Sequence, residues 1–214
     1  MRRSGIAVAF AVFPMTIAAG IAQAQGTGSA KATESGVTLY GGYRASNQLT
    51  EASTEQNVYV NSGASYALAV DFGIDRNRQW EIFYSRQKTQ LTSAGFSAAA
   101  DNVPITIEYL HAGGTYFPQG LGNGSYVAAG LGATLLSPDR AGLSSVTKPS
   151  LSLAAGFLIP FGKNLGLRLE ARGYATLLNN SGGMFCDSNT GCTVAVKGSA
   201  LYQGEALVGL SARF

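Results

Sequence analysis

The chain has 214 residues, with 15 basic and 12 acidic side chains, two cysteines and a single histidine. Charged residues make up only 13% of the chain, well below the roughly 25% of ordinary soluble domains. The balanced charge offers no basic face for nucleic acid. The single histidine leaves few ligands for a metal, so no metal or cofactor site is expected.

The first 24 residues have the pattern of a cleaved signal peptide. Two arginines precede an apolar run, and Ala22-Gln23-Ala24 forms a small-residue cleavage site. The alternative is a permanent anchor, but the run barely reaches the ~18–20 residues of a spanning helix and contains Pro14. We expect the mature protein to begin near Gln25 and to leave the cytoplasm.

The rest of the chain divides into a short polar segment, residues 25–34, and one domain, residues 35–214. The polar segment "QGTGSAKATE" is predicted to lie in the periplasm. The domain contains eight segments in which apolar side chains alternate with polar or small ones, as in strands with two different faces. These segments are residues 36–46, 58–73, 79–90, 104–117, 125–136, 150–161, 165–177 and 201–214.

The connections between these segments alternate in length. Short, turn-like connections follow the second, fourth and sixth segments, and long ones span about 47–57, 91–103, 137–149 and 178–200. This is the layout of an outer-membrane barrel, with short periplasmic turns and long outer loops. The sequence therefore predicts an all-β fold, an eight-stranded antiparallel up-and-down transmembrane β-barrel. A secreted soluble β-sandwich is the alternative fold.

If the aliphatic side chains face lipid, the charged side chains on the strands face the barrel interior, or lumen. Eight strands leave an interior just wide enough to be filled by side chains, and unpaired buried charges are costly. We therefore predict a lumen plugged by ion pairs. Its members are Arg44, Asp71, Glu81, Glu108, Arg168, Glu170, Arg172, Glu205 and Arg213.

Two further expectations follow from this assignment of faces. Placing Glu108 inward places His111 outward, toward lipid. A Ser-His-acid hydrolase would have to use His111, which would then share a face with no carboxylate, so no enzyme is expected. Aromatic residues near the strand ends are predicted to form interfacial girdles: Tyr43, Trp80, Tyr84, Phe117, Phe161, Tyr202 and Phe214.

The two cysteines lie six positions apart in the last long connection, in "CDSNTGC". A local disulfide between Cys186 and Cys192 is expected in an exported protein. The alternatives are a redox pair or a metal pair.

The signal peptide, the eight alternating segments, "LGLRLEARGYATL" and the terminal "ALVGLSARF" together resemble the small outer-membrane β-barrels of the OmpA/OmpX/OmpW type from Gram-negative bacteria. The resemblance implies that the last strand is read by the barrel-assembly machinery. It assigns that recognition to Val208, Leu210, Ala212 and Phe214. It also implies an outer-membrane location, with membrane lipid and lipopolysaccharide as neighbours.

These features favour a non-enzymatic barrel that presents four loops outward for adhesion, envelope integrity or binding of an extracellular or host ligand. The second hypothesis is a narrow, OmpW-like channel for small solutes. The third is a lipid-modifying enzyme of the outer membrane, and it is the least favoured.

Overall fold

The computed structural model describes residues 35–46, 48–51, 57–93, 102–139, 144–178, 183–187, 191–197 and 200–214. The predicted signal peptide and residues 25–34 lie outside the described residues. Every regular element in the described part of the chain is a β-strand, and none of the described residues forms a helix able to cross a membrane.

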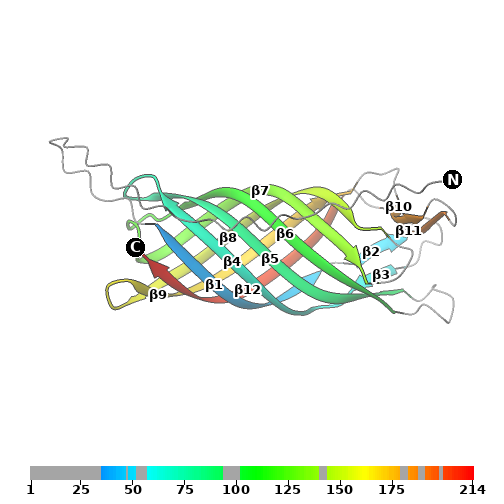
Figure 1. Ribbon diagram of the computed structural model, residues 1–214, viewed down its shortest axis with the longest axis horizontal. Coiled ribbons are helices and arrows are strands. Elements are labelled where there is room, and N and C mark those ends of the chain that lie inside the picture. Colours follow the sequence, from blue (N-terminus) through cyan, green and yellow to red (C-terminus); the bar gives the residue numbers. More distant parts are fainter. Residues whose placement is uncertain are drawn as a thin grey trace, which may run out of the picture. The chain divides into compact units, whose positions relative to one another are not determined.

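Eight long strands close into an antiparallel barrel (Figure 1). Neighbours along the chain pair with each other, and β1 pairs with both β4 and β12, while β5 pairs with β6. The predicted up-and-down order is thus confirmed. The eight strands are β1 (Gly36–Ser46), β4 (Gly63–Gly73), β5 (Arg78–Ser93), β6 (Asn102–Tyr116), β7 (Gly124–Pro138), β8 (Val146–Phe161), β9 (Leu165–Leu177) and β12 (Ala200–Arg213).

The strand register fixes the tilt of the barrel. Starting from Leu135 on β7, directly paired residues can be followed through β6, β5, β4, β1, β12, β9 and β8 and back to β7. The circuit returns at Ser125, ten residues away from its start. A shear of ten with eight strands corresponds to a strand tilt of about 41°. Each row of paired residues therefore climbs by about 3 Å per strand.

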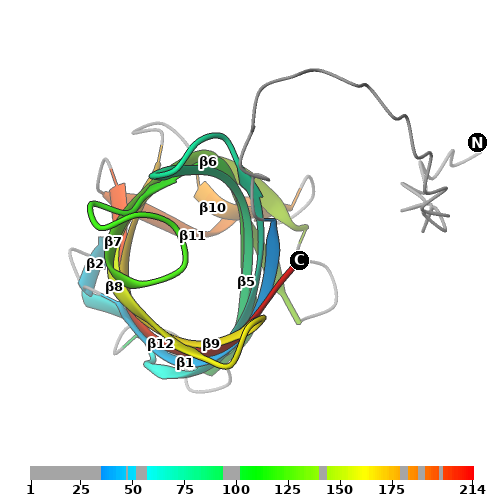
Figure 2. The same ribbon diagram turned by 90° about the vertical axis from the view of Figure 1, so that its left-hand side faces the viewer.

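The barrel has two distinguishable ends. We call "turn end" the end that carries the three short connections, residues 74–77, 117–123 and 162–164, and "loop end" the opposite one. Both Ser35 and Phe214 lie at the turn end, where their backbones exchange two hydrogen bonds of 2.9 and 3.1 Å. Viewed along the axis, the connection between β6 and β7 folds over the opening of the closed ring (Figure 2).

Alternation along the strands separates an apolar exterior from a mixed interior. Leu131, Leu210 and Phe214 are 71%, 63% and 75% exposed, whereas the charged side chains of Arg44 and Arg168 are buried. A soluble protein would place these two kinds of side chain the other way round.

Four short strands were not predicted, and they extend the sheet at the loop end. They are β2 (Gln48–Glu51), β3 (Asn57–Val60), β10 (Gly183–Asp187) and β11 (Gly191–Lys197), in the order β10-β11-β2-β3-β5. The expected strand 58–73 is consequently divided into β3 and β4. These elements are four to seven residues long, too short for alternation alone to distinguish them from loop segments.

The backbone of the β10–β11 hairpin pairs Cys186 directly with Cys192. Their side chains lie outside what the structure describes, so the disulfide stays a prediction.

Candidate functional site

The middle of the lumen holds a buried cluster of two arginines and three carboxylates, which we call the central cluster. Its members are Asp71, Glu81, Arg168, Glu170 and Arg172. They come from β4, β5 and β9, because alternation places every second residue of each strand inside.

Arg172 and Arg168 connect the three carboxylates. Arg172 donates from Nε to Glu170 and from Nη2 to Glu81, both at 2.7 Å. Arg168 Nη1 donates to Asp71 Oδ2 at 2.7 Å, and its Nη2 lies 3.5 Å from Glu81. Each arginine also lies over an aromatic ring, Arg172 over Phe83 and Arg168 over Tyr126. Carboxylates and aromatic rings thus replace the water that would otherwise surround the two guanidinium groups.

A second ion pair lies nearer the loop end. Arg44 Nη2 donates to Glu205 Oε1 at 3.0 Å, and both side chains are fully buried. Ser85 and Tyr174 donate hydroxyl hydrogen bonds to the same carboxylate. The guanidinium carbon of Arg44 lies 4.9 Å from the centre of the Tyr109 ring, which stacks on Tyr174.

Apolar layers lie on both sides of these charges. At the turn end, Phe117, Tyr126 and Leu158 pack together, with Leu121 against them. Phe117 was expected in a girdle, but it is 1% exposed because it continues the inward-facing row of β6. At the loop end the lumen is filled by aliphatic side chains, among them Leu91, Val103, Ile105, Ile107, Leu136 and Leu201.

The predicted orientation of His111 is wrong. His111 is 1% exposed and faces the lumen, where its Nε2 lies 2.8 Å from Ser150 Oγ and its ring lies 5.5 Å from that of Tyr109. The space comes from Gly132 on β7, because a Cβ there would lie 1.9 Å from the carbonyl oxygen of Leu110 and 2.7 Å from the His111 ring. Among the described residues no carboxylate bonds to His111, so the arrangement is not a Ser-His-acid triad.

The prediction that Glu108 belongs to the lumen plug is also wrong. Glu108 lies on the outer face between the outward-facing rows of β5 and β7, and its side chain is 22% exposed. Tyr84 donates a hydrogen bond of 2.5 Å to its carboxylate, and Arg86 Nε lies 3.7 Å away. Polar partners on the neighbouring strand make an outward-facing carboxylate tolerable. The alternation along β6 alone could not reveal these partners.

The remaining predicted residues all lie on β12 or directly after it. Arg213 is half-buried at the turn end, in the inward-facing row. Val208, Leu210, Ala212 and Phe214 form the exposed outer row of the same segment. This placement leaves their role in assembly a prediction.

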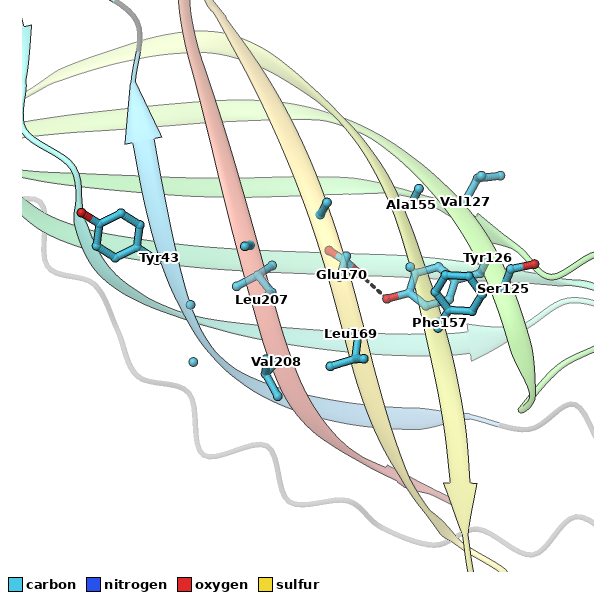
Figure 3. Close-up of a pocket in the computed structure, with 15 residues that line it drawn as sticks. Tyr43, Ser125, Tyr126, Val127, Ala155, Phe157, Leu169, Glu170, Leu207 and Val208 are labelled. Carbon is cyan, nitrogen blue, oxygen red and sulfur yellow. Dashed lines mark hydrogen bonds between the residues drawn. The ribbon is translucent and has the colours of Figure 1, made fainter.

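The outer wall carries a shallow apolar groove of about 720 Å³ across β1, β12, β9, β8 and β7. Phe157, Leu169 and Val208 form one row of paired residues along the groove, and Ala155, Ala171 and Ala206 form the adjacent row. Figure 3 shows Tyr126 and Glu170 joined by their hydrogen bond of 2.7 Å. Both side chains are buried and belong to the lumen.

The chemistry available in the lumen is that of a buried polar network. Among the described residues no three histidine, cysteine, aspartate or glutamate side chains are placed so that they could hold a metal ion. The central cluster has two positive and three negative groups, and each arginine has charged partners within hydrogen-bond distance. Such an arrangement ties β9 to β4 and β5 across the lumen.

No protein-family model and no curated protein matches the chain. Solved structures do. Neisserial surface protein A (NspA) superposes with a TM-score of 0.58 at 17% identity, over 84% of this chain and 97% of that one. The outer membrane protein OprG from Pseudomonas aeruginosa superposes with a TM-score of 0.53 at 12% identity, over 84% and 95%. The chain has the fold of the eight-stranded outer-membrane barrels. At these identities the likeness concerns the fold.

Proposed function

We propose that the protein is an outer-membrane β-barrel with a closed lumen, whose loop end acts as a structural or adhesive surface. One observation carries this proposal: the exposed side chains around the barrel are large and apolar, while the charged side chains of Arg44, Arg168 and Arg172 are buried inside. This inversion suits a wall that faces hydrocarbon. Export would follow from the predicted signal peptide.

In the orientation expected of an outer-membrane barrel, the turn end lies in the periplasm and the loop end lies outside the cell. The strands β2, β3, β10 and β11 then form a sheet beyond the membrane, and a disulfide between Cys186 and Cys192 would tie its outer hairpin. A rigid extension of this kind suits contact with an extracellular or host ligand, or with neighbouring lipopolysaccharide. No enzymatic activity is proposed.

A closed lumen is supported by three successive layers along the axis. The central cluster lies between the aromatic layer around Phe117 and Tyr126 and the aliphatic layer around Ile105 and Leu136. An ion crossing the barrel would have to leave water for both apolar layers, which is very costly. Reconstitution into planar bilayers should therefore give no steady conductance.

The competing function is a narrow, OmpW-like channel for small apolar solutes. The aliphatic loop-side layer favours it, because such a surface would accept an apolar molecule. A steady single-channel conductance, or uptake of an apolar solute by vesicles that depends on the protein, would support the channel over the closed barrel.

Membrane insertion is tested by electrophoresis in detergent of the outer-membrane fraction, with and without boiling. A folded barrel should migrate differently from the boiled sample. Recovery of the mature protein in soluble form without detergent would contradict the proposal.

A further inference from the structure

A second groove lies on the outer wall at the turn end, across β5, β6, β7 and β8. Its volume is about 620 Å³. Trp80, Gly114, Ala129 and Leu153 occupy one row of paired residues across the four strands. Gly114 and Ala129 leave the floor low, while Trp80 and Leu153, which are 62% and 64% exposed, form the two side walls.

The groove is inclined rather than horizontal. Directly paired residues lie closer to the turn end when they are followed from β8 through β7 and β6 to β5. The row therefore rises toward the loop end from Trp80 on β5 to Leu153 on β8, by about 3 Å at each strand. The row below it contains Arg78, Tyr116 and Val127, which also line the groove. The path therefore begins beside a guanidinium group at the turn end and continues upward between apolar walls.

The charges at the lower end come from the turn between β4 and β5. Asp75 accepts hydrogen bonds from the backbone N–H groups of Asn77 and Arg78, both at 2.9 Å, and from Arg78 Nε at 2.6 Å. These bonds hold Arg78 beside the groove with 65% of its side chain exposed. Arg76, in the same turn, is exposed and forms no ion pair with any described residue. Residues 74–78 thus carry one net positive charge.

We propose that this groove binds an anionic phospholipid of the periplasmic leaflet, with its phosphate at Arg76 and Arg78 and one acyl chain along Gly114 and Ala129. The proposal rests on the proposed membrane function, which places the turn end at that leaflet. An aromatic side chain such as Trp80 is suited to the level where headgroup and hydrocarbon meet. A phospholipid carries its charged phosphate, its interfacial region and its acyl chains in the same order as the groove presents the two arginines, Trp80 and the apolar floor.

The chain supplies its own probe, because Trp80 is the only tryptophan. The protein is inserted into phosphatidylcholine vesicles that contain a small fraction of phosphatidylglycerol brominated in its acyl chains, and quenching of Trp80 fluorescence is measured. The reference uses the same fraction of brominated phosphatidylcholine. One net positive charge near the membrane surface should make the apparent affinity for phosphatidylglycerol about fivefold higher.

Three variants separate the parts of the site. Replacing both arginines, R76Q/R78Q, should abolish the preference for phosphatidylglycerol. Ala129→Leu should reduce quenching by both brominated lipids, because it fills the floor of the groove. Lys163→Gln is the matched control, because it removes a positive charge from another turn at the same end and does not line the groove. It should leave the preference unchanged.

Heat-dependent migration of each sample shows whether the barrel has inserted, independently of lipid choice. Failure of the wild-type protein to insert would contradict the proposed function. Insertion with equal quenching by the two lipids would overturn the lipid site and leave the proposed function standing. An equal loss of preference in Lys163→Gln and R76Q/R78Q would also overturn it, because general surface charge would then be the cause.

Discussion

Arg172→Met should destabilise the barrel strongly, because it removes one of two cations from a cluster of three carboxylates. The variant deletes two hydrogen bonds of 2.7 Å, to Glu81 and Glu170, and a cation–π contact with Phe83 in which the guanidinium carbon lies 3.6 Å from the ring centre. Methionine keeps much of the apolar volume. The formal charge of the central cluster changes from −1 to −2.

Removing one partner from a buried ion pair typically costs about 3–5 kcal/mol, and we expect a loss of that size for Arg172→Met. The double variant R172M/E170Q restores the formal charge of −1 and should recover part of the loss. The matched control is Arg78→Gln, which breaks an exposed ion pair with Asp75. Exposed pairs contribute little, so this variant should unfold as the wild type does.

The assay is equilibrium unfolding by guanidinium in lipid vesicles, followed by the fluorescence of Trp80 and by heat-dependent migration. Comparable midpoints for Arg172→Met and Arg78→Gln would refute the reasoning, because the lumen charges would then not be linked to stability. A double variant less stable than Arg172→Met would refute the charge argument specifically.

Three other predictions concern the ends of the barrel. The predicted disulfide should leave Cys186 and Cys192 unreactive toward alkylating reagents until the protein is reduced, whereas ready labelling of the unreduced protein would exclude the bond. Deletion of Phe214 should impair insertion and leave export intact, as measured by fractionation, and full insertion of this variant would contradict the predicted assembly signal. Hydrogen bonds from the backbone N–H of Asn77 and from the side chain of Arg78 lower the pKa of Asp75. A lowered folded-state pKa stabilises the turn above the ordinary carboxyl pKa, and this contribution is lost as the pH falls through the lowered value. Asp75→Asn should therefore lower the free energy of unfolding slightly at neutral pH and leave it unchanged in strong acid, as measured by unfolding at both pH values. An equal effect at the two pH values would contradict this assignment.

The strand alternation in the sequence was sufficient to predict the eight barrel strands and the inward face of eight of the nine charged residues assigned to the lumen, and the alternating connection lengths predicted the antiparallel order. Alternation is a local property, and a wall between lipid and a filled lumen imposes it on each strand separately. Arg168, Glu170 and Arg172 could therefore be assigned correctly from β9 alone.

What the tertiary structure decided depends on neighbours across strands. Glu108 is outward because β5 provides Tyr84 and Arg86 beside it, and His111 is inward because Gly132 and Ser150 make room and a partner for it. The groove at Trp80 likewise exists only because the register brings Gly114 and Ala129 next to one another. Register is a property of paired strands, so the alternation along one strand cannot show which side chains will lie beside one another.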